Sequence, residues 1–367
     1  MFSIIQNIPG VSTKTRIRFM FTLAVILLSS AGAVWGQTTI YVDGSNVWTE
    51  YGSNPLFGGS GGNVAYYPSV LKVGSTYHIW YGDGSITRHA SSANANFSSV
   101  TFPAPSCTGL SVGAYHPRVL YKADGWTIGG TSYAGPFLMY STTGNDWTAS
   151  PRVAHSADGD SWTDIGACTG VNTYVVDAAV YNFDVLFEGG TTRKAYADKG
   201  EGKVEYYTST DGLNWTGVAH DILGAPLQLW ETLNTSPHAI KVDAYYVLFY
   251  GSGGTSFNQA IGMAVSTDGQ HFTKSAANPI FSTTGAPSWR DDRTYTPSVF
   301  QDAADWKMYF TGKSTTGSNY SIGYATNSGL FRLISDAIDI LRNYNLGNTL
   351  KGTFILNSSS CQPEVNE

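Results

Sequence analysis

The sequence predicts an all-β protein: a five-bladed β-propeller closed by an N-terminal strand and followed by a short C-terminal helical tail. Two observations support this fold class. A proline marker recurs about every sixty residues, and each copy is followed by short runs rich in aromatic and β-branched residues. Glycine and aspartate occupy the turns between these runs. Repeats of this length, each holding several short strands, are typical of propeller blades.

The first 36 residues are expected to be a signal peptide. Lys14, Arg16 and Arg18 precede an apolar run over residues 19–28, and small residues follow up to Gly36. A basic segment, a short apolar segment and a small-residue cleavage site form an export signal in this order. A single membrane anchor is the alternative. After cleavage the protein is expected to be secreted or periplasmic, without further membrane contact.

The marker of each inner strand is a proline followed two residues later by an apolar residue. It reads YPSV at Pro68, HPRV at Pro117, SPHAI at Pro237 and TPSV at Pro297. We interpret VVDAAV as a degenerate copy, with Ala178 in the proline position. The steps between these positions are 49, 61, 59 and 60 residues, which predicts five units. A six-bladed ring is the structural competitor.

Two further runs complete each unit. The first is aromatic and is expected to form the middle strand: YHIWYG, PFLMYS, FDVLFEG, YYVLFYG and WKMYFTG. The second leads into a turn that reads SADGDSW, STDGLNW or STDGQHF in the three central units. In such turns the aspartate bonds to backbone groups two residues on, and the glycine accepts a positive φ. Short antiparallel strands are therefore expected throughout.

The propeller is expected to span residues 37–331. The last unit ends near Phe331 without an obvious outer strand, whereas the segment 46–57 precedes the first inner strand. We therefore predict that this N-terminal segment completes the last blade. Residues 332–367 fall outside the repeat. Apolar residues at helical spacing over 333–344 predict a short helix, and a polar tail follows.

Composition excludes some functions. Charged residues make up 13% of the chain, the net charge is −6, and no basic run is available to neutralise phosphates, so a nucleic-acid partner is not expected. The three cysteines lack metal-ligand spacing, and no cofactor is predicted. Cys107 and Cys168 can pair in an exported protein, but the sequence does not decide this. We expect a monomer, and the presence of Ca²⁺ in the central channel stays open.

The units described above resemble those of the five-bladed propeller glycosidases, which include arabinanases, xylosidases, invertases and levansucrases. They are also similar to the related propeller phosphorylases that act on mannosides. The resemblance covers roughly residues 46–331 and rests on the repeated PSV, IG-A-S-DG-W and NP motifs. It implies a saccharide ligand and carboxylates at the propeller axis. One carboxylate precedes the first inner-strand proline, and another, usually glutamate, lies in a later blade.

The residues before the marker prolines depart from that family pattern. They are Tyr67, His116, Asp177, Ser236 and Thr296, so only the third unit offers an acid. Asp177 is therefore our leading catalytic candidate, with Glu231 or Asp292 as the second carboxyl. Cleavage of a glycosidic bond needs two carboxyl groups on opposite sides of the bond. The family resemblance favours a glycoside hydrolase, and the missing first-unit acid favours a glycan-binding or surface scaffold protein without turnover.

Several other residues near the inner strands are candidates for substrate binding. Aromatic faces stack on sugar rings, and phenol hydroxyls bind polar groups. Arginine beside carboxylates can organise a polar pocket or bind a sugar acid. The substrate-binding candidates are Tyr67, Tyr115, His116, His238, Arg293 and Tyr295.

Overall fold

The structure is a computed structural model. The residues that it describes are 38–41, 48–58, 64–84, 86–111, 114–143, 151–171, 180–198, 202–227, 229–242, 244–253, 259–275, 277–303, 305–317, 319–327, 332–335, 354–356 and 363–365. The predicted signal peptide lies outside these ranges. Among the described residues, no helix has the length and apolar character needed to cross a membrane.

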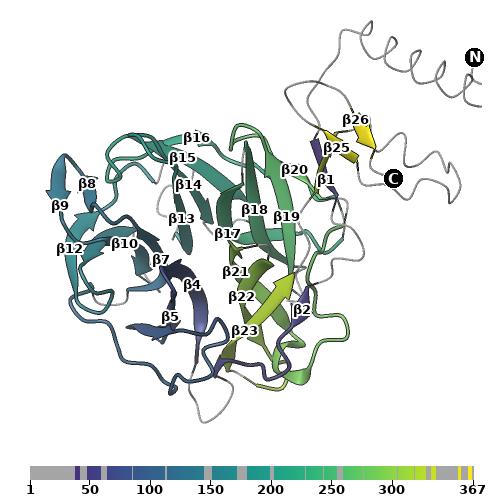
Figure 1. The fold of residues 1–367 in the computed structure, drawn as a ribbon, viewed down its shortest axis with the longest axis horizontal. Coiled ribbons are helices and arrows are strands. Elements are labelled where there is room, and N and C mark those ends of the chain that lie inside the picture. The colour runs from purple at the N-terminus through teal and green to yellow at the C-terminus, as the bar shows by residue number, and fades with distance from the viewer. Residues whose placement is uncertain are drawn as a thin grey trace, which may run out of the picture. The chain divides into compact units, whose positions relative to one another are not determined.

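Five antiparallel sheets form the blades of a propeller (Figure 1). Blade 1 contains β4 (Tyr66–Val73), β5 (Thr76–Asp83) and β6 (Ile86–Ser92). Blade 2 contains β7 (Ala114–Tyr121), β10 (Phe137–Thr143), β11 (Arg152–Ser156) and β12 (Trp162–Ala167). Blade 3 contains β13 (Asn182–Phe187), β14 (Arg193–Asp198), β15 (Val204–Ser209) and β16 (Thr216–Ala219). Blade 4 contains β17 (Leu233–Val242), β18 (Tyr245–Gly253), β19 (Ala260–Ser266) and β20 (Thr273–Lys274).

Blade 5 confirms the predicted closure. It contains β21 (Arg293–Asp302), β22 (Asp305–Lys313) and β23 (Tyr320–Asn327), and its outer strand comes from the N-terminal segment. Both β2 (Thr49–Glu50) and β3 (Phe57–Gly58) pair with β23. The inner strands pack side by side in the order β4, β7, β13, β17 and β21, and β21 returns to β4. The described part of the chain therefore closes as five blades.

The marker prolines give the inner strands a common irregularity. Strand pairing shifts register at the proline in blades 1, 2, 4 and 5. The residue before each of these prolines has a positive φ, between 49° and 59°. This conformation is costly for residues other than glycine, and it is most often retained where a side chain must be directed to a functional position. Here each bulge turns the pre-proline side chain toward the propeller axis.

The third unit differs from our prediction. The run FDVLFEG was expected to begin the middle strand, but residues 182–187 form the inner strand β13, and β14 is the middle strand. The marker of this unit is Asn182-Phe183-Asp184-Val185, with phenylalanine in the proline position. The assignment of Ala178 to that position is therefore wrong. Without a proline, the sequence of this unit carried no clear register signal.

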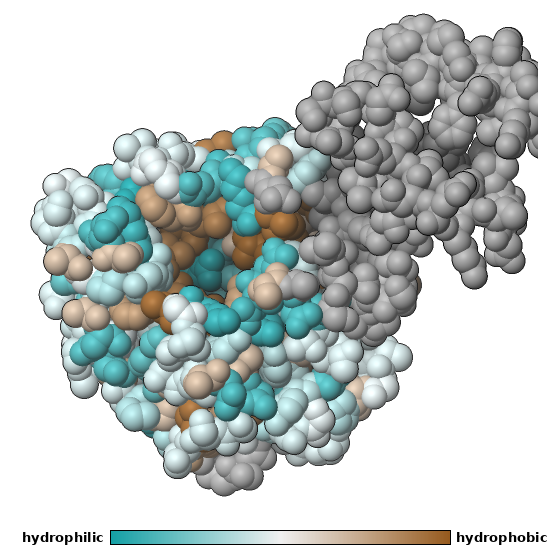
Figure 2. All heavy atoms as spheres, in the orientation of Figure 1, coloured by the Kyte–Doolittle hydropathy of each residue, from teal (hydrophilic) through white to brown (hydrophobic). Residues whose placement is uncertain are grey.

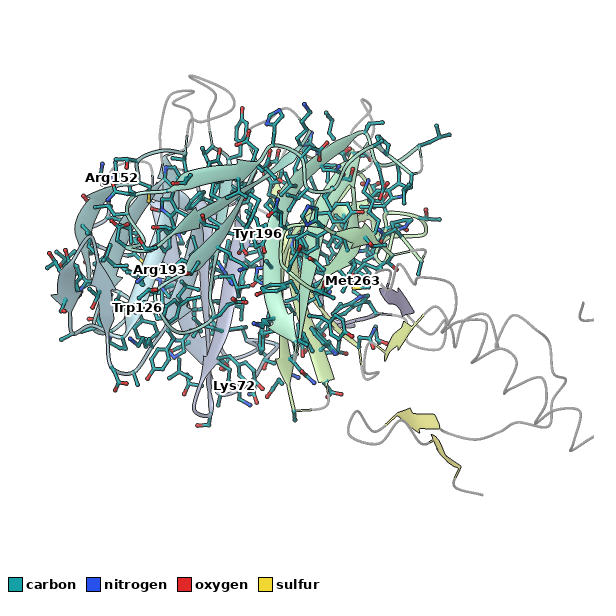
Figure 3. All side chains as sticks on the ribbon, turned by 90° about the horizontal axis from the view of Figure 1, so that it is seen from above. Lys72, Trp126, Arg152, Arg193, Tyr196 and Met263 are labelled. Atoms are coloured by element: carbon teal, nitrogen blue, oxygen red, sulfur yellow. The ribbon has the colours of Figure 1, made fainter. Side chains whose placement is uncertain are left out.

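The Ser-x-Asp-Gly turns connect neighbouring blades. In blade 3, the Ser209 hydroxyl accepts a bond from the Gly212 N–H at 2.8 Å, and Asp211 accepts the Asn214 N–H at 2.8 Å. The carbonyl of the turn glycine then accepts a hydrogen bond from a side chain in the middle strand of the preceding blade. These 2.8 Å bonds are Trp80 to Gly159, Tyr140 to Gly212 and Tyr196 to Gly269. Tyr196 is labelled in Figure 3.

Short additional elements lie outside the five blade sheets. The hairpin of β8 (Trp126–Ile128) and β9 (Thr131–Tyr133) is bonded to blade 3, because Arg193 donates to the Thr127 carbonyl at 2.7 Å (Figure 3). One 3-10 turn, η1, covers Ser288–Arg290. Two strand pairs complete the described elements: β1 (Thr38–Tyr41) with β24 (Arg332–Ser335), and β25 (Phe354–Leu356) with β26 (Pro363–Val365).

Two sequence expectations are settled by these elements. Residues 333–335, the start of the expected helical segment, are strand because β24 pairs with β1. Residues 336–344 lie outside the described ranges. Cys107 and Cys168 are free thiols in the structure, so the pairing that the sequence left open does not occur.

Candidate active site

The five inner strands enclose a narrow polar channel. Three residues from each marker line it, and the enclosed volume is about 40 Å³. This volume holds roughly three water molecules and no sugar ring. Any ligand as large as a sugar ring would have to bind outside the channel, at its mouth. Figure 2 shows one face of the propeller hollowed near its centre, with apolar side chains on the walls and polar side chains at the bottom.

The channel has two tiers of side chains. The residues before the marker form the mouth tier, which consists of Tyr67, His116, Asn182, Ser236 and Thr296. The residues after it form the floor tier, which consists of Ser69, Arg118, Asp184, His238 and Ser298. Since the two tiers belong to the same bulged strands, the backbone that builds the floor also positions the mouth.

The floor tier bonds each blade to the next. Ser69 accepts the Val119 N–H at 2.9 Å, and Ser298 accepts the Val70 N–H at 3.0 Å. Asp184 Oδ1 lies 2.8 Å from Arg118 Nε. These contacts connect blade 1 to 2, blade 5 to 1 and blade 2 to 3.

Asp184 and His238 complete this circle of contacts. Asp184 accepts the Ala239 N–H at 2.8 Å, and His238 Nε2 donates to the Val299 carbonyl at 2.9 Å. Burial alone raises the pKa of Asp184, but Arg118 and His238 hold it below its ordinary value. His238, a predicted substrate ligand, is buried with both ring nitrogens facing protein acceptors. The structure therefore places it in the floor.

Tyrosines gather at the blade 5 and blade 1 side of the mouth. The ring of Tyr67 lies 5.2 Å from that of Tyr66 and 6.0 Å from that of Tyr295. The ring of Tyr320 lies 5.7 Å from that of Tyr66. Burial raises the pKa of Tyr67 and of Tyr295, so both remain neutral phenols at physiological pH. Two predicted binding residues, Tyr67 and Tyr295, are thus brought together.

His116 joins the same group. Its ring centroid lies 3.6 Å from that of Tyr67, and its Nδ1 contacts the Tyr181 carbonyl. Burial lowers the pKa of His116 to about 3, so the ring is neutral at physiological pH. A neutral imidazole here can exchange hydrogen bonds with a sugar hydroxyl but supplies no charge.

A carboxylate that the sequence analysis did not single out lies at the mouth. Asp198 ends β14 opposite Asn182 and is 3% exposed. Its Oδ2 accepts the Ser236 N–H at 3.2 Å and the Asn182 amide at 3.3 Å. Its charge raises the pKa of Tyr67 across the channel. A correct register for the third unit would have identified it, since Asp198 pairs directly with the mouth residue.

Glu231 lies away from the axis, in a buried ion pair of blade 4. Lys274 Nζ is 3.1 Å from Glu231 Oε2, and Tyr250 donates to Oε1 at 2.6 Å. Burial alone raises its pKa, but Tyr250, the Leu227 N–H and Lys274 together lower it. All of these partners stabilise the carboxylate as an anion, which is the form that a general acid cannot use.

Asp292 and Arg293 lie at the edge of blade 5. Asp292 Oδ2 is 3.1 Å from Lys313 Nζ and 3.4 Å from Arg293 Nε. Arg293 also lies near enough to Tyr295 to lower its pKa, against the larger effect of burial. Arg293 and Tyr295 therefore belong to one neighbourhood, with Asp292 bridging the two cations beside it.

Some predicted positions lie outside the description. Asp177 falls in the segment 172–179, which the structure does not describe, and of Tyr115 only the backbone in β7 is described. The position that Asp177 was expected to fill, before the third marker, belongs to Asn182. In the described ranges no three His, Cys, Asp or Glu side chains are grouped to hold a metal ion.

Comparison with solved structures identifies proteins of the same architecture. A thermostable family-43 glycoside hydrolase aligns with a TM-score of 0.55 and 17% identity, covering 76% of this chain and 96% of that one. The chain has the fold of five-bladed propeller glycoside hydrolases. No protein-family model and no curated protein matches the sequence.

Two other similar structures support the same conclusion about the fold. The α-L-arabinofuranosidase from Podospora anserina, solved in complex with cellotriose, aligns with a TM-score of 0.58 and 10% identity. That alignment covers 77% of this chain and 96% of the arabinofuranosidase. A glycosyl hydrolase from Bacteroides ovatus aligns with a TM-score of 0.54 and 15% identity, covering 82% and 97% of the two chains.

Proposed function

We propose that this protein is an exported glycoside hydrolase that acts on an oligo- or polysaccharide at the mouth of its propeller. One observation carries the proposal: a buried carboxylate, Asp198, faces a tyrosine-rich mouth in a fold shared with glycoside hydrolases. Tyrosine rings can stack on a sugar, and a carboxylate at the axis can act as acid or base toward its glycosidic bond. We further propose that the protein acts as a monomer.

Asp198 replaces the sequence-based argument for Asp177 as the primary catalytic candidate. Asp198 lies at the mouth because it pairs with Asn182 across neighbouring strands. Asn182 occupies the position before the third marker that the sequence analysis had assigned to Asp177. Asp177 stays a candidate for the second carboxyl, since two are needed to cleave the bond. Separate Asp198→Asn and Asp177→Asn variants distinguish the two assignments.

The test is a screen of the purified protein against aryl glycosides and polysaccharides, with binding measured in parallel. For an acid or base role, Asp198→Asn should lower the rate by about 10²–10⁴-fold while circular dichroism stays unchanged. Asp305→Asn, at an exposed position of β22, is the matched control and should retain full activity. Full activity in Asp198→Asn would contradict the assignment of that residue.

The second candidate function is glycan binding without turnover. It is favoured by Tyr67, which occupies the first-unit position where the similar family carries an acid. Saccharide binding with no turnover on any substrate would select this alternative, and absence of both would reject a carbohydrate function.

Export has its own test. We propose that residues 1–36 are removed on secretion, because of their basic, apolar and small-residue segments. Amino-terminal sequencing of the protein recovered from the medium or periplasm should begin near Gln37. A retained N-terminus would instead support the membrane anchor.

A further inference from the structure

A hydrogen-bonded chain of two histidines and an aspartate crosses from blade 1 to blade 2, away from the channel. His78 in β5 and His89 in β6 meet with Nδ1 and Nε2 3.1 Å apart. His89 Nδ1 is 2.7 Å from Asp160 Oδ1, in the turn between β11 and β12. The two rings are stacked, with an interplanar angle of 5°. The chain therefore connects the middle strand β5 and the outer strand β6 of blade 1 to the blade 2 turn.

The same turn is also held by a tryptophan. Trp80 stacks on His89 with centroids 4.4 Å apart and donates to the Gly159 carbonyl at 2.8 Å. The contact between the Trp80 ring and the turn is tight, because a Cβ on Gly159 would lie 2.9 Å from the ring. Any change that separates His89 from Asp160 therefore also strains the packing of Trp80 on this turn.

The hydrogen-bond pattern fixes the protonation of the chain. An ionised carboxylate only accepts, so His89 Nδ1 carries the proton that faces Asp160. In neutral His89 the other nitrogen, Nε2, is then an acceptor, and His78 must donate from Nδ1. One extra proton can be placed on His78 Nε2 without breaking either bond. A second proton would put two N–H groups opposite each other at the 3.1 Å contact, and the chain would separate.

Two other titratable groups among the described residues interact with this chain. Asp158 of the same turn and the Cys107 thiol of the segment before blade 2 are the ones that interact with these residues or their aspartate. Burial raises the pKa of Cys107 to about 12, so the thiol stays neutral. Apolar side chains pack around Trp80, and they include Leu71 of β4 and Phe137 of β10. Protonation of the histidines thus controls the charge of this seam between blades.

We propose that the Asp160–His89–His78 chain is an acid-sensitive latch between blades 1 and 2. At neutral pH it holds the turn 156–162 against Trp80, and in acid, uptake of the second proton releases that turn before the propeller unfolds as a whole.

The direction of the pH effect follows from linkage. Burial lowers the pKa of His78 to about 4, and burial also lowers that of His89. In the released turn both regain ordinary values near 6.5. The open form therefore binds more protons, and the closed form loses stability as pH falls from 6.5 toward 4. For each proton taken up on opening, the opening constant rises about tenfold per pH unit.

The test is hydrogen exchange, measured by mass spectrometry between pH 7 and pH 4 and corrected for the intrinsic pH dependence of exchange. In the wild type, protection of residues 156–162 should fall at least about tenfold per pH unit below pH 6.5, while the middle strand β18 stays protected. In His78→Gln the amide can rotate and accept from protonated His89, so this slope should fall to less than half. His271→Gln is the matched control, because His271 pairs with Asp268 at 2.7 Å in the blade 4 turn and has no histidine neighbour.

Asp160→Asn provides a second arm that does not depend on a buried substitution, since the Asp160 side chain is 56% exposed. Removing the charge weakens the contact with His89 Nδ1, so protection of the turn should already be lower at pH 7, and it should still fall below pH 6.5. A pH-independent protection of the turn in the wild type, or the same slope in His78→Gln as in the wild type, would overturn the proposal. A changed slope in His271→Gln would do so too.

Discussion

At the scale of single residues, the turn glycines show how local conformation and inter-blade packing combine. Gly212 has a φ of 76°, which disfavours any side chain, and a Cβ there would lie 2.8 Å from Tyr140 Oη and 2.9 Å from Ile128 Cδ1. Tyr140 is the residue that donates to the Gly212 carbonyl from the preceding blade. Glycine is therefore required at position 212 for two reasons. It adopts the positive φ without strain, and its lack of a Cβ lets the side chains of blade 2 pack against the turn.

We predict that Gly212→Ala lowers the free energy of unfolding by about 2–4 kcal/mol, measured by urea denaturation. The left-handed conformation contributes about 1–2 kcal/mol, and displacement of the buried neighbours supplies the rest. Gly74→Ala is the control, because Gly74 also has a positive φ, 58°, but nothing lies within 4 Å of its added Cβ. The Gly74→Ala variant should lose only the part of the free energy of unfolding that comes from the left-handed backbone conformation. Equal losses in the two variants would contradict the role of inter-blade contact at Gly212.

At the scale of elements, two blades use the same ion pair with opposite polarity. In blade 4 the acid Glu231 precedes the inner strand and the base Lys274 lies on the outer strand. In blade 5 the base Arg290 precedes the inner strand, and the acid Glu50 lies on the outer strand β2. Trp230 and Trp289 precede the two residues and pack beside the glycines of the next strands. This equivalence explains Glu231 as a structural residue and makes Arg290–Glu50 the contact that fastens the closing strand.

We predict that Glu50→Ala lowers the free energy of unfolding by about 3 kcal/mol, because the Arg290 side chain, 7% exposed, loses its partner. Adding Arg290→Met should restore much of this loss, since no unpaired buried charge then remains. Asp164→Ala breaks the pair with Arg152, whose side chains are both 32% exposed, and should cost less than about 1 kcal/mol. A Glu50→Ala variant as stable as Asp164→Ala would show that β2 is held by strand pairing alone.

At the scale of the whole molecule, the blades are joined by contacts that repeat from seam to seam. Between blades 5 and 1, Asp302 binds Lys72 at 2.7 Å and also contacts Tyr77. Between blades 3 and 4, Glu188 binds Lys241 at 3.1 Å and interacts with Tyr246. These three-residue groups, the floor tier and the aromatic bonds to turn carbonyls use different residues of each blade. The ring is thus stabilised by many modest contacts of a few kinds.

The sequence predicted the ring because its strongest signals are backbone signals. Pro68, Pro117, Pro237 and Pro297 each mark an inner strand, and their spacing gave the blade number and the closing strand. The third unit has Phe183 in the proline position, so its register was misplaced and Asp198 was overlooked. The inward or outward direction of a polar residue depends on strand pairing. Composition could not show that His238 lies in the floor or that Glu231 is held in a buried ion pair.

The stability of the propeller should fall continuously as the solution becomes acidic. Burial lowers the pKa of His116 to about 3 and that of His78 to about 4, so the folded protein binds fewer protons than the unfolded chain below pH 6.5. Stability present above pH 6.5 is therefore lost as pH falls toward these values. Bonds from the Asn214 backbone and side chain outweigh burial and lower the pKa of Asp211 to about 2, and the pKa of Asp184 is also lowered. These carboxylates extend the loss below pH 4.

We predict that the free energy of unfolding, measured by urea denaturation at pH 7, 6, 5 and 4, falls by at least about 1.4 kcal/mol per pH unit between pH 6 and pH 4. That slope corresponds to one proton taken up on unfolding. His116 alone accounts for this proton, because it is buried in the folded protein and becomes exposed on unfolding. In His116→Asn the slope should decrease by close to one proton, whatever the change in absolute stability. His271→Asn, at an exposed ring, should leave the slope unchanged. A flat profile from pH 6.5 to pH 4 in the wild type would show that these histidines titrate normally in the fold, and that the mouth accepts a charged imidazole.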